Sequence, residues 1–350
     1  METLKEAAER VYKETLSVSK TSELLKETFK KGTESDYKFY NHVRSFVRLS
    51  DFYKETHPSN SPQTQQNSEQ AKSDKQILAE NRKEAEKSLY ADPMIIKNDW
   101  NGDRIIRLGL LGDTHIGSKW EQPSYLHKAY DIFKSEGITD VYHAGDMTEG
   151  TMMRAGHQYE CYVQGYDDIL DTVLRTYPSR YGIKTSFITG NHDHSMIKHC
   201  GADIGFSIAR ERSDMVYLGA SQANIYLTPN CKFLLTHPGG GSAYSLSYKT
   251  QKMIEAMSGG EKPHLFAHGH FHKSLYMFYR NVHAFQVGTT QAQTPFMGSM
   301  GLAASMGFWI IELHVTDEGE IKWLKQEFFP FYREIKDDYK NFIGYAGGKV

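Results

Sequence analysis

Five apolar, strand-like runs in this chain each open into a short polar segment that combines glycine with Asp, Asn or His. The runs IIRLGLL, VYHA, SFIT, FLLT and HLFA are followed by GDTHIG, GDM, GNHDH, HPGG and HGHFH. These polar side chains offer the oxygen and nitrogen atoms that divalent metal ions bind. In α/β sheets, ligands bind beyond the carboxyl ends of the strands. We therefore expect the five segments to meet in space and to form a metal site.

The set of candidate ligands is larger than a single ion needs. It comprises Asp113, His115, Asp146, Asn191, His237, His270 and His272. A lone histidine at a strand end is usually structural, so the inference rests on the whole set. Seven oxygen and nitrogen donors exceed a tetrahedral site and suit two divalent cations. In two-metal hydrolases the ions lie about 3.5–4 Å apart, and a shared carboxylate is the usual bridge.

The elements that must position these residues predict a layered α/β domain over residues 101–350. Strand-like runs first alternate with amphipathic helices, which is a βαβαβ pattern, and one long helix is expected within HQYECYVQGYDDILDTVLRTY. The later runs are rich in strands and are interrupted by a helix from about Leu246 to Met257. A β-sandwich flanked by helices fits this order better than a purely parallel sheet.

The first 100 residues differ from the rest of the chain in composition and in the spacing of their apolar residues. Residues 1–55 predict three short helices with tight connectors, which resemble a helix-turn-helix module; a helical cap on the neighbouring domain is the alternative. Residues 56–75 are rich in Ser, Gln, Asn and Pro and predict a flexible linker. Residues 76–100 are expected to hold a charged connecting helix that ends before Asp92-Pro93.

Composition narrows the class of protein. The formal net charge is −2, so binding to nucleic acid would need a local basic patch. Three widely spaced cysteines with no CxxC pair exclude a thiolate zinc site of the usual spacing and a disulfide framework. The N-terminal segment METLKEAAERVYKETL lacks the apolar region of a signal peptide, and no run approaches transmembrane length. We expect a cytoplasmic protein without a membrane partner, and a homodimer stays open.

The ordered set GDTHIG, GDM, GNHD, a lone His in THP, and GHFH resembles the signature of calcineurin-like metallophosphoesterases. Each motif alone is weak, but all five occur in the family order, each after an apolar strand. By motif the resemblance covers about residues 105–272, and it implies the α/β sandwich fold of that family. It also implies a metal-dependent phosphoester hydrolase.

The resemblance assigns roles to individual residues. Asp113, His115 and His272 would hold one metal ion. Asn191, His237 and His270 would hold the second, and Asp146 would bridge the two. A metal-bridging hydroxide would be the nucleophile. His192 matches the family's histidine that is not a ligand and would protonate the leaving oxygen, with Asp193 orienting its ring. Mn²⁺ is the first expectation for the ions, with Fe, Zn, Ni or Mg as alternatives.

The substrate is less defined than the reaction. Protein phosphatases of this superfamily carry GDxxDRG, whereas this chain has GDMTEG, without the arginine. The chain is similar instead to SbcD-like DNA exonucleases and to stand-alone phosphoesterases of phages and prophages. We therefore expect a phosphodiesterase or nuclease that acts on DNA, with Arg154, His157 and Tyr159 lining the substrate cleft. The alternatives are a small-molecule phosphodiesterase or nucleotidase, and a non-catalytic DNA-binding or regulatory module.

Overall fold

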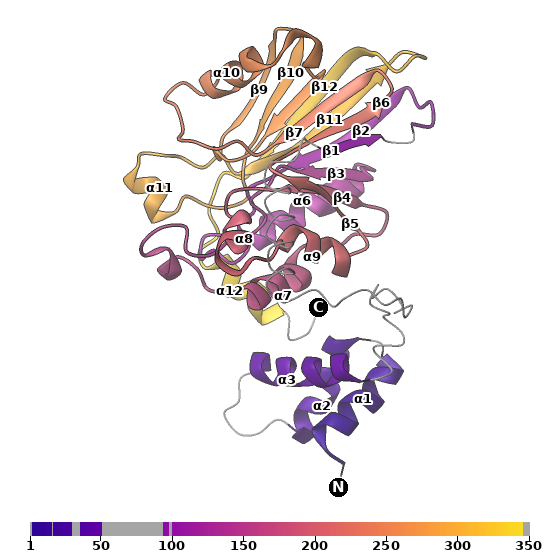
Figure 1. The fold of residues 1–350 in the computed structure, drawn as a ribbon, viewed down its shortest axis with the longest axis vertical. Coiled ribbons are helices and arrows are strands. Elements are labelled where there is room, and N and C mark those ends of the chain that lie inside the picture. The colour runs from indigo at the N-terminus through magenta and orange to yellow at the C-terminus, as the bar shows by residue number, and fades with distance from the viewer. Residues whose placement is uncertain (1, 16, 30–35, 51–93, 98–99, 346–350) are drawn as a thin grey trace, which may run out of the picture. The chain divides into compact units, whose positions relative to one another are not determined.

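The computed structural model describes residues 2–15, 17–29, 36–50, 94–97 and 100–345 (Figure 1). The chain divides into two compact units, Met1–Lys72 and Ser73–Val350. The linker expected at 56–75 lies outside the described residues, and so does the connecting helix expected before Asp92-Pro93. Among the described residues, no helix is long and apolar enough to cross a membrane.

Within its described residues, the N-terminal unit has three helices, α1 (Leu4–Thr15), α2 (Val18–Phe29) and α3 (Asp36–Leu49). Each helix presents one apolar face, as the spacing of its apolar residues predicts. These faces form a small core of Ala7, Ala8, Val11, Tyr12, Leu25, Phe39, Val43 and Val47. The three expected helices are therefore present, and the helix-turn-helix interpretation of them stays a prediction.

The second unit is built on two six-stranded sheets. One sheet has the order β1-β6-β7-β8-β10-β9 and the other has the order β12-β11-β2-β3-β4-β5. The strands of the first sheet are β1 (Met94–Lys97), β6 (Gln222–Thr228), β7 (Cys231–Thr236), β8 (Leu265–His268), β9 (Ser274–Tyr279) and β10 (Val282–Val287). Those of the second sheet are β2 (Ile105–Leu111), β3 (Asp140–His143), β4 (Lys184–Thr189), β5 (Met215–Ala220), β11 (Gly307–Val315) and β12 (Ile321–Pro330).

The two sheets pack face to face through alternating side chains. In β7, Cys231, Phe233 and Leu235 are buried while the residues between them are partly exposed, which is the period of two that a strand produces. These side chains share one core with Leu110 of β2 and Trp309 of β11. The expected β-sandwich is therefore confirmed.

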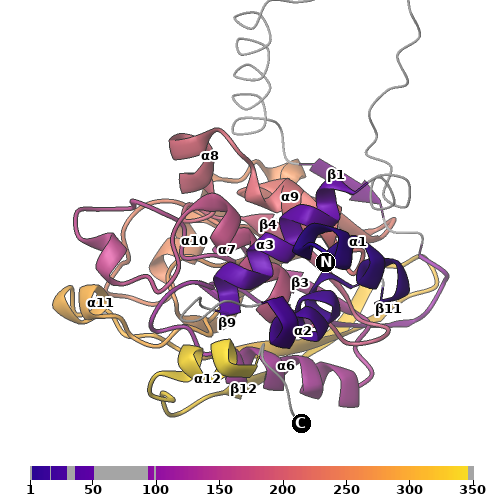
Figure 2. The same ribbon diagram turned by 90° about the horizontal axis from the view of Figure 1, so that it is seen from below.

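Helices cover both outer faces of the sandwich (Figures 1 and 2). Among the residues of this unit that the structure describes, the helices are α6 (Pro123–Ser135), α7 (Tyr166–Thr176), α8 (His194–Cys200), α9 (Ile204–Glu211), α10 (Tyr248–Ala256), α11 (Pro295–Ser299) and α12 (Asp338–Tyr345), with short 3₁₀ turns η1 (His157–Tyr159) and η2 (Gly259–Glu261). Residues of α6, α7 and α9 form a core with the second sheet. Ile254 of α10 packs on the outer face of the first sheet against Phe266 and Val282.

Two details differ from the sequence-based expectation. Residues 94–97, which lie after the expected end of the connecting helix and before the range 101–350 expected for the catalytic domain, form strand β1, which pairs in parallel with β6. The long helix expected from His157 to Tyr177 is divided into η1 and α7. Gly165, with a φ of 88°, precedes α7, and this left-handed conformation interrupts the helical path.

The order of the strands brings the five polar segments together. β2, β3 and β4 are parallel neighbours in one sheet, and β7 and β8 are parallel neighbours in the other. Their carboxyl ends point to the same edge of the sandwich. There the Asp113 N–H donates to the carbonyl oxygen of Gly145, and the His270 N–H donates to the Asp113 carboxylate, each at 2.9 Å. The loops of both sheets therefore meet at this edge.

Candidate metal centre

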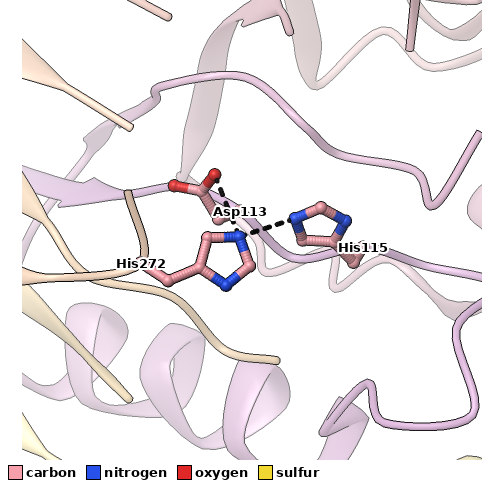
Figure 3. Close-up of side chains that lie close together, drawn as sticks. All are labelled: Asp113, His115 and His272. Atoms are coloured by element: carbon pink, nitrogen blue, oxygen red, sulfur yellow. Dashed lines mark hydrogen bonds and ion pairs between the residues drawn. The ribbon is translucent and has the colours of Figure 1, made fainter. Parts of the chain in front are cut away.

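The first group of candidate ligands joins the loop after β2 to the loop after β8 (Figure 3). His115 Nε2 and His272 Nε2 lie 3.0 Å apart, and His272 Nε2 lies 3.6 Å from Asp113 Oδ1. All three side chains are buried. Two imidazole nitrogens and a carboxylate oxygen thus face one another, as they would around one shared cation.

The second group comes from the loops after β3, β4, β7 and β8. His237 Nε2 lies 3.1 Å from Asp146 Oδ2 and 3.1 Å from Asn191 Oδ1. His237 Nδ1 lies 2.8 Å from the Ala144 carbonyl oxygen, so Nδ1 carries the proton and Nε2 presents its lone pair. His270 uses Nε2 in the same way toward the Gly240 carbonyl oxygen, at 2.7 Å, which leaves its Nδ1 as the free nitrogen.

The carboxylate of Asp146 lies between the two groups. Its Oδ2 atom is 3.1 Å from His237 Nε2 and 3.9 Å from His115 Nε2. Its Oδ1 atom accepts the backbone N–H of His192 at 2.8 Å, which fixes the orientation of the carboxylate. A single oxygen atom therefore approaches ligands of both groups.

The chemistry of these donors fits a metal ion. The His237 Nε2 lone pair faces two oxygen acceptors, and only a proton or a cation between them makes this arrangement favourable. The closeness of these oxygen atoms also changes the pKa of His237. Burial alone would lower the pKa of His237, but the Asp146 carboxylate raises it to about 9. Binding of a metal ion at these donors would release the protons that they hold.

Five of the seven candidate ligands have a left-handed backbone. Positive φ angles occur at Asp113, His115, Asp146, His270 and His272, between 48° and 79°. Such a conformation costs a residue other than glycine about 1–2 kcal/mol, and it persists only where the surroundings impose it. Its concentration at the ends of these strands indicates that the loops are shaped for binding rather than for stability.

Two glycines make room for ligands that come from other strands. A Cβ atom at Gly190 would lie 2.2 Å from Asp146 Oδ1, and one at Gly145 would lie 2.7 Å from His237 Nδ1. Gly145 also has a φ of 88°. Each glycine therefore allows its loop to pass against a ligand on a neighbouring loop.

His192 lies at the edge of the centre, with its ring centroid 4.6 Å from that of His115. Its Nδ1 atom is 2.7 Å from the Glu149 carbonyl oxygen, which places the proton on Nδ1 and leaves Nε2 free. Burial lowers the pKa of His192. His192 also forms a group of possible ligands with His115 and Asp146, so geometry alone permits it a second role.

Asp193 occupies a different position from the one predicted. Its carboxylate accepts the N–H groups of Met147, Thr148 and Gly190, at distances of 2.8–3.1 Å. It thereby ties the loop after β4 to the loop after β3. The expectation that Asp193 orients the ring of His192 is corrected by this geometry, because the Glu149 carbonyl oxygen holds that ring.

Glu149 is the residue that sequence reasoning missed. Its carboxylate lies 3.0 Å from His115 Nδ1 and 2.8 Å from His157 Nε2, and it accepts the side-chain amide of Gln291 at 2.8 Å. Burial would raise the pKa of Glu149, but the neighbouring His115 and His157 hold it well below its usual value. A carboxylate behind a histidine ligand fixes the ring and increases its basicity. The acidic residue in GDMTEG was the available signal.

The three residues expected to line a substrate cleft have different environments. His157 is fully buried behind Glu149, so it supports the centre and does not line a cleft. Arg154 pairs with Glu160 at 2.5 Å, and its guanidinium lies 4.0 Å from the centre of the Phe296 ring. Tyr159 is largely exposed to solvent. Only Arg154 and Tyr159 remain candidates for contact with a substrate.

Comparisons with solved structures give distant likenesses. The chain is similar to an archaeal phosphodiesterase, with a TM-score of 0.37 and 14% identity over 64% of this chain and 100% of that one. It is similar to Vps29 of Entamoeba histolytica complexed with zinc, with a TM-score of 0.33 and 14% identity over 64% and 99% of the chains. For GAP50 of Plasmodium the TM-score is 0.36, at 13% identity over 71% and 96%. The curated proteins contain no match to the chain.

A family model gives a direct assignment. The model described as the calcineurin-like phosphoesterase superfamily domain matches residues 106–303 of the 350. This range contains all seven candidate ligands, His192 and Glu149. It also spans the five strand ends on which the centre is built, and it covers more than half of the chain. The chain therefore belongs to the calcineurin-like phosphoesterase superfamily and is a metal-dependent phosphoesterase.

Proposed function

We propose that this protein is a two-metal phosphodiesterase that acts on DNA, with His192 as its general acid. The observation that carries the two-metal part is the position of Asp146 Oδ2, which approaches both His237 and His115. Two bound cations would supply a hydroxide near neutral pH and positive charge against the phosphate. Asp113, His115 and His272 would hold one cation, Asn191, His237 and His270 the other, and Asp146 both.

Mn²⁺ is the ion that we propose first. The donors are imidazoles, carboxylates and an amide oxygen, without a thiolate, which suits borderline divalent cations. Elemental analysis of protein purified without added metal, followed by activity with Mn, Fe, Zn, Ni and Mg, tests this choice. A content of two ions per chain supports the two-metal proposal, and a content of one contradicts it.

The role of His192 follows from its two ring nitrogens. Nδ1 is engaged with the Glu149 carbonyl oxygen, so the tautomer and the ring plane are fixed. In the imidazolium form Nε2 also carries a proton, and Nε2 is the atom that would pass this proton to the leaving oxygen as the phosphoester bond breaks. Asp146 accepts the backbone N–H of His192, so the acid and the bridging carboxylate keep a constant separation.

DNA as the substrate is supported by two features of the chain. GDMTEG lacks the arginine with which related protein phosphatases hold a phosphorylated side chain. The N-terminal unit has its own core of three short helices, which suits a DNA-binding module. The test compares bis-aryl phosphodiesters with single- and double-stranded DNA in the presence of Mn²⁺. Cleavage of the aryl diester with intact DNA would remove DNA as the substrate and keep the hydrolase.

A small-molecule phosphodiesterase or nucleotidase is the second candidate function. It is favoured by the fact that all seven candidate ligands lie between residues 113 and 272, in a unit separate from the three helices. This candidate predicts that cyclic nucleotides are cleaved and that deletion of residues 1–72 leaves their rate of hydrolysis unchanged.

A further inference from the structure

Large apolar side chains are exposed on two loops that leave the edge of the sandwich near the metal centre. Met152 and Tyr159 lie on the loop after β3, and Phe296 lies on α11, after β10; Met152 is 70% and Phe296 42% exposed. Both ribbon views place α11 beside the loop that contains η1 (Figures 1 and 2). Single exposed apolar residues are ordinary, but adjacent ones beside a functional centre mark a binding surface.

Met152 is tied to the loop that carries His192. Gly150 lies so close to the His192 carbonyl oxygen that a Cβ atom there would be 2.2 Å from it. The next residue, Thr151, donates its N–H to Ser195 Oγ at 2.8 Å. Met152 follows with a φ of 49°, a left-handed conformation that a long side chain rarely adopts. The chain thus accepts backbone strain at a residue that presents an apolar side chain to solvent, two residues after the contact of Gly150 with the backbone of the proposed acid.

Phe296, which follows β10, contacts Arg154 on the loop after β3. The Arg154 guanidinium lies 4.0 Å from the centre of the Phe296 ring, and Glu160 neutralises its charge. Gln291, four residues before α11, donates to the Glu149 carboxylate behind the metal centre. Arg154 is therefore a positioning residue that links the two loops, and the exposed part of the Phe296 ring remains available.

We propose that Met152 and Phe296 form an apolar platform that binds the planar base of a nucleotide esterified to the scissile phosphate. Bases stack on aromatic rings without regard to their sequence, and the methionine sulfur makes favourable contacts with aromatic rings. The proposal rests on the proposed phosphodiesterase function and adds to it that the enzyme recognises the base as well as the phosphate.

The experiment uses two diesters that differ only in their bases. The Mn²⁺-loaded full chain is given dithymidine phosphate and an analogue in which hydrogen replaces both bases, and products are quantified by liquid chromatography and mass spectrometry. The variants are Met152→Ala and Phe296→Ala. The matched control is Phe278→Ala, which removes an aromatic ring that is 58% exposed on β9. Thermal unfolding of each variant checks that the fold is intact.

We expect the wild type to prefer dithymidine phosphate by about tenfold or more in kcat/KM, as stacking of a base on one aromatic ring implies. Met152→Ala and Phe296→Ala should lose this preference through a higher KM, with the abasic diester unaffected and Phe278→Ala like the wild type. Cleavage of both diesters without preference, or a preference that survives in both variants, overturns the platform alone. Cleavage of neither diester overturns the proposed function and the platform with it.

Discussion

His192 is the residue at which two roles compete. It lies close enough to His115 and Asp146 to act as a third ligand, yet its Nδ1 atom is already engaged with a backbone carbonyl oxygen. Only Nε2 is then available, either for a metal ion or for the leaving group. The two roles can be distinguished by measuring the metal content and the turnover of a variant separately.

His192→Asn is expected to reduce kcat by about 10²–10⁴-fold, because a general acid contributes a factor of that size. The metal content should stay at the wild-type level, since the seven other donors remain. Elemental analysis and steady-state kinetics on an aryl diester measure both quantities. His199→Asn, an exposed position in α8, is the control and should behave as wild type. A parallel loss of metal would identify His192 as a ligand.

Glu149→Gln tests whether the buried carboxylate supports His115 as a ligand. The amide keeps the shape of the side chain but loses the charge that faces His115 and His157. We expect the affinity for Mn²⁺, measured by isothermal titration calorimetry, to fall about 10–100-fold. Glu318→Gln, on an exposed turn, provides the control. An unchanged affinity would mean that Glu149 has only a structural role.

Residue types and spacing were enough to name candidate ligands that the fold brings together, but not all of the residues that support them. The seven candidate ligands follow strand ends, and the fold brings them into two groups that share Asp146. Glu149 was missed because its function depends on His157, which approaches it only after the following loop has folded back. The role predicted for Asp193 failed for a similar reason, since neighbours in sequence, such as Asp193 and His192, point in different directions in a tight turn.

At the scale of elements, the strands were more predictable than the connections between them. An apolar run that ends in glycine identifies a strand and its carboxyl end, and five such ends located the centre. Helical periodicity was less reliable between His157 and Tyr177, where Gly165 has a left-handed φ angle and the helix begins only at Tyr166. Amphipathic spacing does not reveal such a break, because the apolar residues on both sides still face the core.

Gly190→Ala tests how closely the strand ends must approach. The added Cβ atom would meet Asp146 Oδ1 at 2.2 Å and the Asp146 backbone nitrogen at 2.6 Å. We expect Mn²⁺ binding to be lost and the free energy of unfolding to fall by about 1–3 kcal/mol, the usual cost of overpacking. Calorimetry and urea unfolding provide the measurements. Gly239→Ala is the matched control, because its Cβ atom would meet nothing within 4 Å.

Glu121, which follows β2, makes the stability of the folded chain depend on pH in a predictable way. It is buried, accepts the N–H of Gly117 at 2.7 Å and interacts with the Tyr162 hydroxyl at 2.9 Å. Burial raises the pKa of Glu121 to about 8. The folded chain therefore keeps this carboxyl protonated at pH values where the unfolded chain ionises it. The stability that it contributes is complete below about pH 4.5 and is lost as pH rises toward 8.

Glu121→Gln should remove this dependence, because the amide resembles the protonated carboxyl and does not titrate. Relative to the wild type, the variant should gain stability between pH 5 and pH 8, by on the order of a few kcal/mol at most. Urea unfolding at a series of pH values measures the difference, with Glu318→Gln as the control. A constant difference between variant and wild type would show that Glu121 does not titrate in this range.

At the scale of the whole molecule, the chain consists of two units that each have a hydrophobic core. All seven candidate ligands of the metal centre lie in the second unit. The α/β sandwich and the helical N-terminal region were both predictable from the sequence, because each has its own hydrophobic period. A binding role for the three helices was not predictable, since the spacing of their apolar residues reports only their inner faces.

Deletion of residues 1–72 tests whether the three helices contribute to hydrolysis or to the affinity for DNA. Hydrolysis of a bis-aryl diester should stay within about twofold of wild type, whereas affinity for DNA should fall by about tenfold or more if the helices supply a second contact. Fluorescence anisotropy with labelled duplex measures the affinity. Equal affinity in the truncated and full-length proteins would contradict a DNA-binding role for the three helices.

Strand β1 has a consequence for how this catalytic unit can be isolated. It forms the border of one sheet through parallel pairing of Met94–Lys97 with Ala223–Tyr226 of β6. A fragment beginning at residue 101, where the sequence predicted the domain to start, would leave β6 paired only with β7 and its other edge without partners. An uncovered strand of this kind is a template for pairing with another chain. Such a fragment would retain all seven candidate ligands and yet tend to aggregate.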